Sequence, residues 1–355
     1  MRTSIRWTLR ITAGTIAVLA AAFGGGWLAT KGDRPVPRTV ADDPSLPFAV
    51  VDGVKLHVRT FGDPSRPTVV VVHGGPGNDF RYLLPLAALA DRYHVVFYDQ
   101  RGSGLSERVP DRRLTLDAFY AELDGVVDLF GGGRPVRVVG HSWGAMLASG
   151  YAGRHPEKVS HLVLSEPGML TAEDARRFLA ATNGMRPPLT AEVAWLAART
   201  FLESLHVGGP DGDARSDWFK GTLTSARFDG HPIAGYFCNR DLGTARLESW
   251  RFGARVAPAL LGAAGLDGPA PRVDFASGVE RFPGKVLFLA GSCNAVTGPE
   301  QQRRHMRHFR DAELVVIEGA GHTLFGEKPE ESVAAVRKYL DRPAAAATGP
   351  SSRRL

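Results

Sequence analysis

The chain has 355 residues and a formal net charge of +6 at pH 7, and 44% of its residues are hydrophobic. This length suits one large α/β domain with an insertion better than two unrelated domains. The charge lies at the ends: residues 1–44 hold six Lys or Arg against three Asp, and residues 342–355 hold three Arg and no acid. Residues 45–341 therefore sum to zero, and nucleic acid is not an expected partner.

The N-terminus has the pattern of an export signal. Three arginines within the first ten residues precede 19 uncharged residues, 11–29. As a helix, this stretch would be about 28 Å long, enough to cross a bilayer. Residues 1–30 are therefore an uncleaved signal anchor or, with Ala-Ala-Ala at 20–22 as the cleavage site, a signal peptide. Either interpretation exports the body, as a membrane-anchored extracytoplasmic domain or as a secreted protein.

Two polar segments frame the expected folded part. Residues 31–47 contain four prolines and few hydrophobic side chains, so we expect an extended linker. The folded part is expected to begin near Phe48. At the other end, residues 342–355 are expected to be a disordered tail.

Between these segments, short apolar runs alternate with segments of helical period. The expected strands are residues 48–51, 55–59, 68–72, 94–98, 136–139, 161–164, 285–290 and 313–317. The expected helices are residues 83–90, 115–130, 145–154, 299–309 and 329–340. This order predicts an α/β fold with a mostly parallel sheet flanked by helices.

The alternation is interrupted by a long insertion. Residues 167–281 are prone to helix formation and rich in Arg, Gly and aromatic residues, and they are too many for a loop. We expect a mainly helical cap over the carboxyl ends of the strands, where ligands enter α/β sheets. Residues 48–166 and 282–341 would then form the core.

Residues 140–144 read Gly-His-Ser-Trp-Gly and stand between a strand pattern and a helix pattern. A glycine two positions before and two after the serine lets the backbone turn sharply and expose the hydroxyl, as in a nucleophile elbow. Ser142 is therefore the candidate nucleophile. A glycine-rich strand-to-helix turn without chemistry is the alternative.

A serine hydroxyl is a weak nucleophile unless a base takes its proton. His322 follows the last expected strand on a loop of small residues, so it is the candidate base. The oxyanion of an acyl-transfer reaction needs preorganised N–H donors. We expect one from the backbone of Trp143 and further N–H donors from Gly74 and Gly75, in the loop after strand 68–72.

The chain has two cysteines, Cys238 and Cys293, and neither lies in a Cys-x-x-Cys pattern or beside clustered histidines. Structural zinc is therefore disfavoured, and chemistry based on serine and histidine needs neither a metal nor an organic cofactor. Export permits a disulfide between the two cysteines. Two buried free thiols are the equal alternative.

Three motifs together resemble the α/β-hydrolase family that contains the prolyl iminopeptidases. They are His-Gly-Gly-Pro-Gly at 73–77, Asp-Gln-Arg-Gly-Ser-Gly at 99–104 and Gly-His-Ser-Trp-Gly-Ala at 140–145. The similarity covers residues 48–340 and is specific in the core and weak in the cap. It implies serine hydrolysis through an acyl-enzyme on small peptides, amides or esters, and first of all a prolyl iminopeptidase-like aminopeptidase.

The chain departs from the family at the catalytic acid. The family has an aspartate in a loop that here reads Gly-Ser-Cys-Asn-Ala-Val-Thr-Gly, with Asn294 at the acid position. An asparagine there can favour the wrong histidine tautomer, at a cost of about 10⁴ in rate in a serine protease. Glu166, at the end of strand 161–164, is the candidate replacement because some α/β-hydrolases place an acid at that strand end. Its alternative role is to cap the strand end or to face the cap cavity.

A second departure concerns recognition of a peptide amine. Iminopeptidases hold the free amine of the substrate with cap carboxylates, one of them in an Ala-Arg-Ile-Glu-Asn-His-like motif. Residues 226–231 read Ala-Arg-Phe-Asp-Gly-His, so Asp229 is a candidate for this role, and a solvated loop carboxylate is its alternative. Two other functions stay open: a carboxylesterase or lipase-like hydrolase with the same site, and a non-catalytic binding protein whose site decayed at Asn294.

Overall fold

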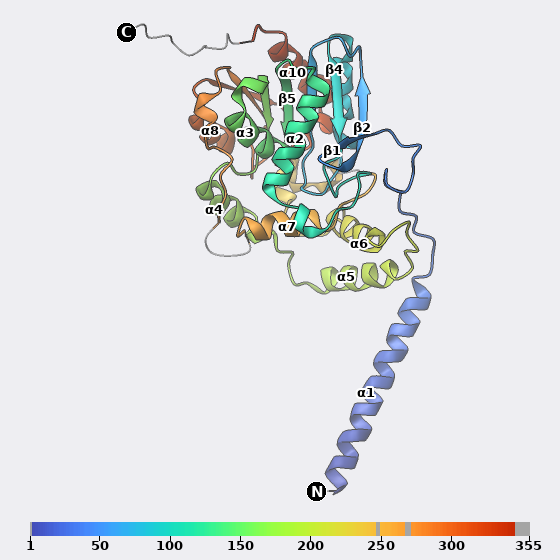
Figure 1. Ribbon diagram of the computed structural model, residues 1–355. Helices are drawn as coiled ribbons and strands as arrows, with labels where there is room; N and C mark the ends of the chain where they lie inside the picture. The colour runs from blue at the N-terminus through green and yellow to red at the C-terminus, as the bar shows by residue number, and fades with distance from the viewer. Residues whose placement is uncertain (1, 246–248, 267–270, 345–355) are drawn as a thin grey trace.

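The computed structural model describes residues 2–245, 249–266 and 271–344 (Figure 1). Its centre is an eight-stranded sheet in the order β1-β2-β4-β3-β5-β6-β7-β8. The strands are β1 (Phe48–Val51), β2 (Val54–Phe61), β3 (Thr68–Val72), β4 (His94–Tyr98), β5 (Val136–His141), β6 (Val159–Ser165), β7 (Val286–Gly291) and β8 (Ala312–Ile317). Strand β2 pairs antiparallel with β1 and β4, and the other neighbours are parallel. The predicted mostly parallel sheet is confirmed.

Helices cover both faces of this sheet (Figure 1). The α-helices of the described chain, including α1 and those of the insertion, are α1 (Arg2–Ala29), α2 (Leu116–Gly131), α3 (Trp143–Arg154), α4 (Ala172–Ala181), α5 (Ala191–Ser204), α6 (Ala214–Thr224), α7 (Val256–Ala263), α8 (Pro299–His305), α9 (Leu324–Glu327) and α10 (Pro329–Leu340). The segment expected as a helix at 83–90 is a 3₁₀ helix, Arg81–Asp91, which contains Pro85.

The central strands are apolar throughout because alternate side chains enter two different cores. In β3, Val70 and Val72 pack in the core that includes α2 and α3. Val69 and Val71 pack in the opposite core, with the 3₁₀ helix Arg81–Asp91 and α10. A strand of continuous valines is therefore the expected sequence for this position.

The parallel register brings the ends of several strands to one edge. Val72 of β3 lies opposite Gly140 of β5, and His141 lies opposite Ser165 of β6. The loops that follow these strands therefore leave the sheet side by side. This edge is where parallel sheets bind their ligands.

The insertion between β6 and β7 contains α4, α5, α6 and α7. Figure 1 shows these helices below the sheet, on the side away from the C-terminus of α10. Residues of α5 and α6 line one cavity together with the loops after β3, β5 and β8. The insertion therefore covers the edge of the sheet at which those strands end.

The proline-rich segment before β1 is extended but does not hang free. Thr39 and Val40 are buried, and the N–H of Val40 donates to the carbonyl of Leu105 at 2.8 Å. Arg251 of the insertion donates to the carbonyl of Pro37 at 3.0 Å. The expectation that the packed chain begins near Phe48 is therefore wrong, because this segment already contributes a buried side chain. Of the expected tail, residues 345–355 lie outside the described residues.

Candidate active site

The turn between β5 and α3 is built as a nucleophile elbow. Ser142 has φ 54° and ψ −119°, a backbone conformation that is strained for a residue with a side chain and is typical of this motif. A Cβ on Gly140 would lie 2.5 Å from the carbonyl oxygen of Gly144, and a Cβ on Gly144 would collide with the carbonyl of Val72. Both glycines are therefore required by close backbone approach.

Ser142, His322 and Glu166 form one chain of hydrogen bonds. Nε2 of His322 lies 3.0 Å from Oγ of Ser142. Nδ1 of the same ring lies 2.7 Å from Oε2 of Glu166. Glu166 directly follows β6 and is fully buried. The three residues singled out in the sequence therefore meet at the carboxyl edge of the sheet.

Asn294 occupies the loop after β7, beside this chain. Its Nδ2 atom donates to Oε2 of Glu166 at 2.7 Å and to Oγ1 of Thr297 at 2.9 Å. The N–H of Gly291 donates to Oε1 of Glu166 at 2.7 Å. Asn294 therefore holds the carboxylate of Glu166, and the carboxylate in turn contacts His322.

Burial controls the charges of these groups. It lowers the pKa of His322 to about 4, so the imidazole is neutral at pH 7 and its Nε2 atom can accept a proton from Ser142. Burial raises the pKa of Glu166 well above its usual range, and the hydrogen bonds from Gly291 and Asn294 offset this rise only in part. These two donors favour the carboxylate form, which accepts the Nδ1 proton of His322.

His141 and Tyr82 lie behind the elbow. Nε2 of His141 donates to the carbonyl of His322 at 2.8 Å. The hydroxyl of Tyr82 lies 2.7 Å from Nδ1 of His141 and accepts the N–H of Gly74 at 2.7 Å. The expectation that Gly74 offers a free N–H is therefore wrong, because Tyr82 already takes it. Tyr82 has no motif signal in the sequence, since only the fold brings it here.

The N–H groups of Gly75 and Trp143 have no acceptor among the residues that the structure describes. Gly75 has φ 129°, which favours glycine, and a Cβ there would lie 2.7 Å from the backbone nitrogens of Gly77 and Asn78. Trp143 opens α3, where the first N–H groups lack intrahelical partners. These two amides are the ones that can receive an oxyanion.

The insertion touches the base directly. The ring of Tyr236 stacks on the ring of His322, with 4.2 Å between centroids and 22° between planes. The backbone N–H of His322 donates to the carbonyl of Tyr236 at 2.9 Å. Sequence analysis missed Tyr236 because it lies in the weakly alignable insertion and acts through its ring face and its main chain.

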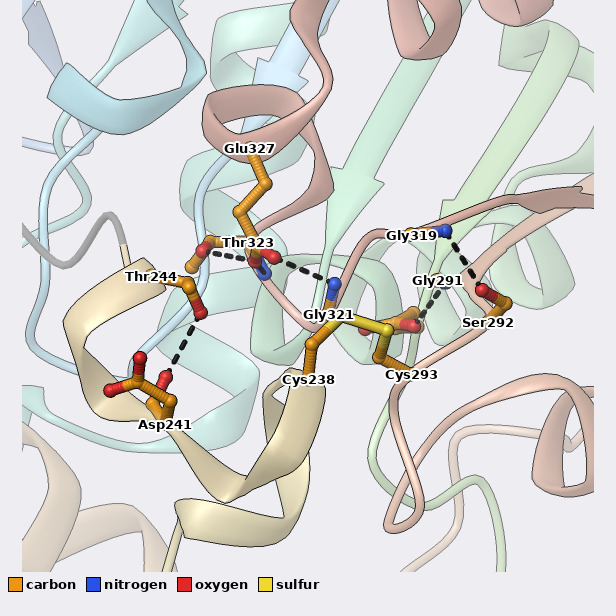
Figure 2. Close-up of a disulfide and its surroundings, with 11 residues drawn as sticks. Cys238, Asp241, Thr244, Gly291, Ser292, Cys293, Gly319, Gly321, Thr323 and Glu327 are labelled. Carbon is orange, nitrogen blue, oxygen red and sulfur yellow. Dashed lines mark hydrogen bonds between the residues drawn. A yellow bond between two sulfur atoms is a disulfide. The ribbon is translucent and has the colours of Figure 1, made fainter.

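A disulfide joins the insertion to the loop that carries Asn294. Cys238 and Cys293 are bonded, which resolves the alternative left open by the sequence. Figure 2 shows the bond beside Gly321, whose N–H donates to Glu327 at 2.7 Å. The disulfide therefore joins chain segments that lie next to Tyr236, Asn294 and His322.

Ser142 and His322 open into a cavity of about 500 Å³. Its walls are mostly apolar, with Met146, Leu196 and Phe252 among them. Among the described residues, no Asp or Glu lines it, and Lys220 is the one Lys or Arg that does. Asp229 instead lines a neighbouring cavity of about 940 Å³. The structure therefore does not bring Asp229 to Ser142.

The possible metal-ligand atoms of His141, Glu166 and His322 lie within 4.8 Å of one another, close enough to hold a metal ion. Each of them already has a hydrogen-bond partner: a carbonyl for Nε2 of His141, an amide for Glu166 and the hydroxyl of Ser142 for Nε2 of His322. The hydrogen-bonded chain accounts for the cluster without a metal ion.

Comparison with known proteins identifies the family. A model of the α/β-hydrolase fold matches residues 67–329. The chain belongs to this family. It is therefore an enzyme, a hydrolase, as the three motifs predict.

Its relatives include iminopeptidases. A proline iminopeptidase of Pestalotiopsis fici is 25% identical over 306 residues, which cover 83% of this chain and 99% of that protein. A proline iminopeptidase of Heyndrickxia coagulans is 36% identical over 137 residues, 37% of this chain and 47% of that protein. Among solved structures, a bacterial membrane phospholipase A has a TM-score of 0.55 at 18% identity, and the match covers 96% of this chain and 98% of that one. At this identity the last likeness shows the fold alone.

Proposed function

We propose that this hydrolase works through an acyl-enzyme on Ser142. His322 takes the proton of the serine hydroxyl as Oγ attacks the substrate carbonyl. The N–H groups of Gly75 and Trp143 stabilise the oxyanion. The protonated His322 then gives its proton to the leaving group. Water attacks the acyl-enzyme next, with His322 taking the proton of the water and returning it to Oγ of Ser142. The distances of 3.0 and 2.7 Å along the hydrogen-bonded chain carry this proposal.

Glu166 is proposed as the acid of the triad. It orients the ring of His322 through Nδ1 and stabilises the imidazolium that forms when the serine is deprotonated. Asn294 assists chiefly as a donor to Glu166 at 2.7 Å, and its Nδ2 atom also lies 3.4 Å from Nδ1 of His322. The 2.7 Å contact between Oε2 of Glu166 and Nδ1 of His322 supports this assignment.

The proposed substrates are neutral carboxylic esters with an apolar acyl group. The support is the cavity beside Ser142, whose described walls are largely apolar and contain no carboxylate. Apolar walls bind an acyl chain by removing it from water. They offer no counterion to a charged substrate amine, since Asp229 faces a different cavity.

A prolyl aminopeptidase is the second candidate, and the two iminopeptidase relatives favour it. That activity needs a carboxylate beside the cavity for the substrate ammonium group. Two acidic residues of the insertion, Glu248 and Asp267, lie outside the residues that the structure describes. Substitution of each by the matching amide therefore tests this candidate directly.

The deciding experiment is a panel of acyl esters, acyl naphthylamides and aminoacyl naphthylamides, with Ser142→Ala as the blank. The proposal expects apolar acyl esters to be turned over fastest and a free α-amine to give no advantage. Preference for prolyl naphthylamide, lost in Glu248→Gln or Asp267→Asn, would establish the aminopeptidase instead. Folded protein that resists a fluorophosphonate probe would leave only a binding function.

We also propose that the body is exported. Residues Ile11–Ala29 form a helix long and apolar enough to cross a membrane, and its side chains are exposed. A disulfide between Cys238 and Cys293 suits an oxidising compartment. The mass of the mature protein distinguishes a retained anchor from a cleaved signal peptide. The proposed domains are the anchor or signal, the linker, the two-part core and the cap.

A further inference from the structure

The end of α1 is fixed against the insertion. Nε2 of His206 donates to the carbonyl of Trp27 at 2.9 Å, and the two rings lie 5.0 Å apart. Gly26 packs so closely on Leu202 of α5 that a Cβ would lie 2.8 Å from Cδ1 of the leucine. Arg34, just beyond the helix, pairs with Glu203 at 3.2 Å. The C-terminal end of α5 therefore sits at the level of residues 26–34.

That level is where a spanning α1 would leave the bilayer. The apolar stretch of 19 residues ends at Ala29, and at 1.5 Å per residue it is about as long as the hydrocarbon core is thick. Figure 1 shows α5 at the lower edge of the body, level with the upper end of α1. If α1 spans the membrane, α5 lies at the headgroups.

Large apolar side chains of α5 and of the loop before it are exposed, beside the charged Arg186 and Glu192. Leu189 is fully exposed and Trp195 is 68% exposed. Phe201, 50% exposed, lies toward α6, where its ring is 6.5 Å from the ring of Phe219. The exposed side also carries small alanines, and the adjacent Arg199 pairs with Glu203 at 3.1 Å. Tryptophan and other large apolar side chains are favoured at the interface between headgroups and acyl chains.

The opposite side of the same helix faces the catalytic cavity. Val193, Leu196 and Ala197 line it, and so do Met185 and Pro187 from the loop before α5. Met185 is also exposed at the surface. One helix thus has its inner face on the cavity of Ser142 and its outer face toward the plane in which α1 leaves the membrane.

We propose that α5 and the preceding loop bind the bilayer surface beside α1, and that the cavity takes its acyl ester from this surface past Met185, which both lines the cavity and is exposed. The first half depends only on α1 being an anchor. The second half rests on the proposed esterase function. The partner of this surface is lipid, because α5 packs on the end of α1, the helix proposed to enter the bilayer.

The first experiment tests the surface without any catalysis. Full-length protein with Ser142→Ala is reconstituted into phosphatidylcholine vesicles, and Trp195→Cys carries an environment-sensitive fluorophore. Both native cysteines are bonded to each other, so the new thiol takes the label. The matched control is Leu129→Cys, which is exposed near the end of α2, at the edge of the sheet opposite Ser142.

We expect a blue-shifted emission at position 195 and quenching by lipids that carry a quencher near the headgroup, with neither effect at position 129. Equal exposure to water at both positions would overturn the proposal. A label that is quenched at both positions would overturn it as well, because the body would then contact lipid without orientation.

The second experiment tests substrate entry in the active protein. Neither Leu189 nor Trp195 lines the cavity, so Leu189→Gln with Trp195→Gln should leave turnover of a short soluble ester unchanged. Turnover of a long-chain ester embedded in vesicles should fall about tenfold, the effect of losing two apolar anchors at the interface. Equal loss on both substrates would refute entry from the surface. If the label at position 195 is buried in lipid but no ester is turned over, the esterase function is refuted and the membrane-binding half of the proposal still holds.

Discussion

The side chain of Asn294 donates to the same oxygen of Glu166 that contacts Nδ1 of His322, each at 2.7 Å. The asparagine in the usual acid loop and the glutamate after β6 therefore belong to one arrangement. In the proposed triad, the glutamate is the acid that orients His322, and the asparagine is a hydrogen-bond donor to it.

This relationship predicts unequal effects of two substitutions. Glu166→Gln removes the charge and can hold the wrong tautomer of His322, so kcat should fall by about 10⁴. Asn294→Ala removes one hydrogen bond to a charged group, so kcat should fall about tenfold. Steady-state kinetics on a soluble ester, with circular dichroism as the check on folding, measure both. The reverse ranking would move the catalytic acid away from Glu166.

The sequence was sufficient to predict the sheet and to place Ser142 and His322 at strand ends. Runs such as residues 68–72 are readable because a strand buried on both faces must be apolar throughout. Ser142 and His322 stand at strand ends with glycines around them, and these signals are local. Tyr82 and Tyr236 carry no such signal, since their roles arise from packing between segments far apart in the chain. Gly74 was assigned wrongly because the acceptor of its N–H, Tyr82, is set by that same packing.

The buried imidazole predicts an enzyme that stays active in acid. Burial lowers the pKa of His322 to about 4, and kcat/KM reports the base of the free enzyme. We therefore expect kcat/KM to stay constant from neutral pH down to about pH 5 and to fall below about pH 4 as His322 is protonated. A pH profile with a soluble ester measures this midpoint. A midpoint at the ordinary histidine pKa of about 6.5 would contradict it.

The same shift predicts how His322 contributes to stability in acid. In the unfolded chain, His322 binds a proton below about pH 6.5, whereas in the folded protein it does so only below about pH 4. Between these values His322 binds more protons in the unfolded state, so its contribution to the free energy of unfolding falls as the pH falls. Glu166, whose pKa burial raises, contributes in the opposite direction. Urea unfolding at several pH values measures the slope. His322→Gln should reduce the slope by up to about one proton, and an unchanged slope would contradict the assignment.

Tyr82 is expected to position the turn that carries Gly75. Its hydroxyl accepts the N–H of Gly74 and contacts His141, so Tyr82→Phe leaves a buried N–H without its acceptor. We expect kcat to fall about tenfold, in line with the cost of a lost buried hydrogen bond, while KM changes little. Tyr93→Phe, which removes a hydroxyl hydrogen bond far from Ser142, is the control. A similar loss in both variants would indicate general destabilisation.

The disulfide should affect both stability and catalysis. Cys238 and Cys293 are 55 residues apart, and a loop of this size predicts a loss of about 2–4 kcal/mol in the free energy of unfolding when the bond is removed. The bond also ties the segment of Tyr236 to the loop of Asn294, and Tyr236 packs on His322. Reduction, or Cys238→Ser with Cys293→Ser, should therefore lower kcat as well as the melting temperature. Thermal melting and kinetics well below the melting temperature separate the two effects. If kcat at low temperature is unchanged while the melting temperature falls, the bond stabilises the fold without positioning His322.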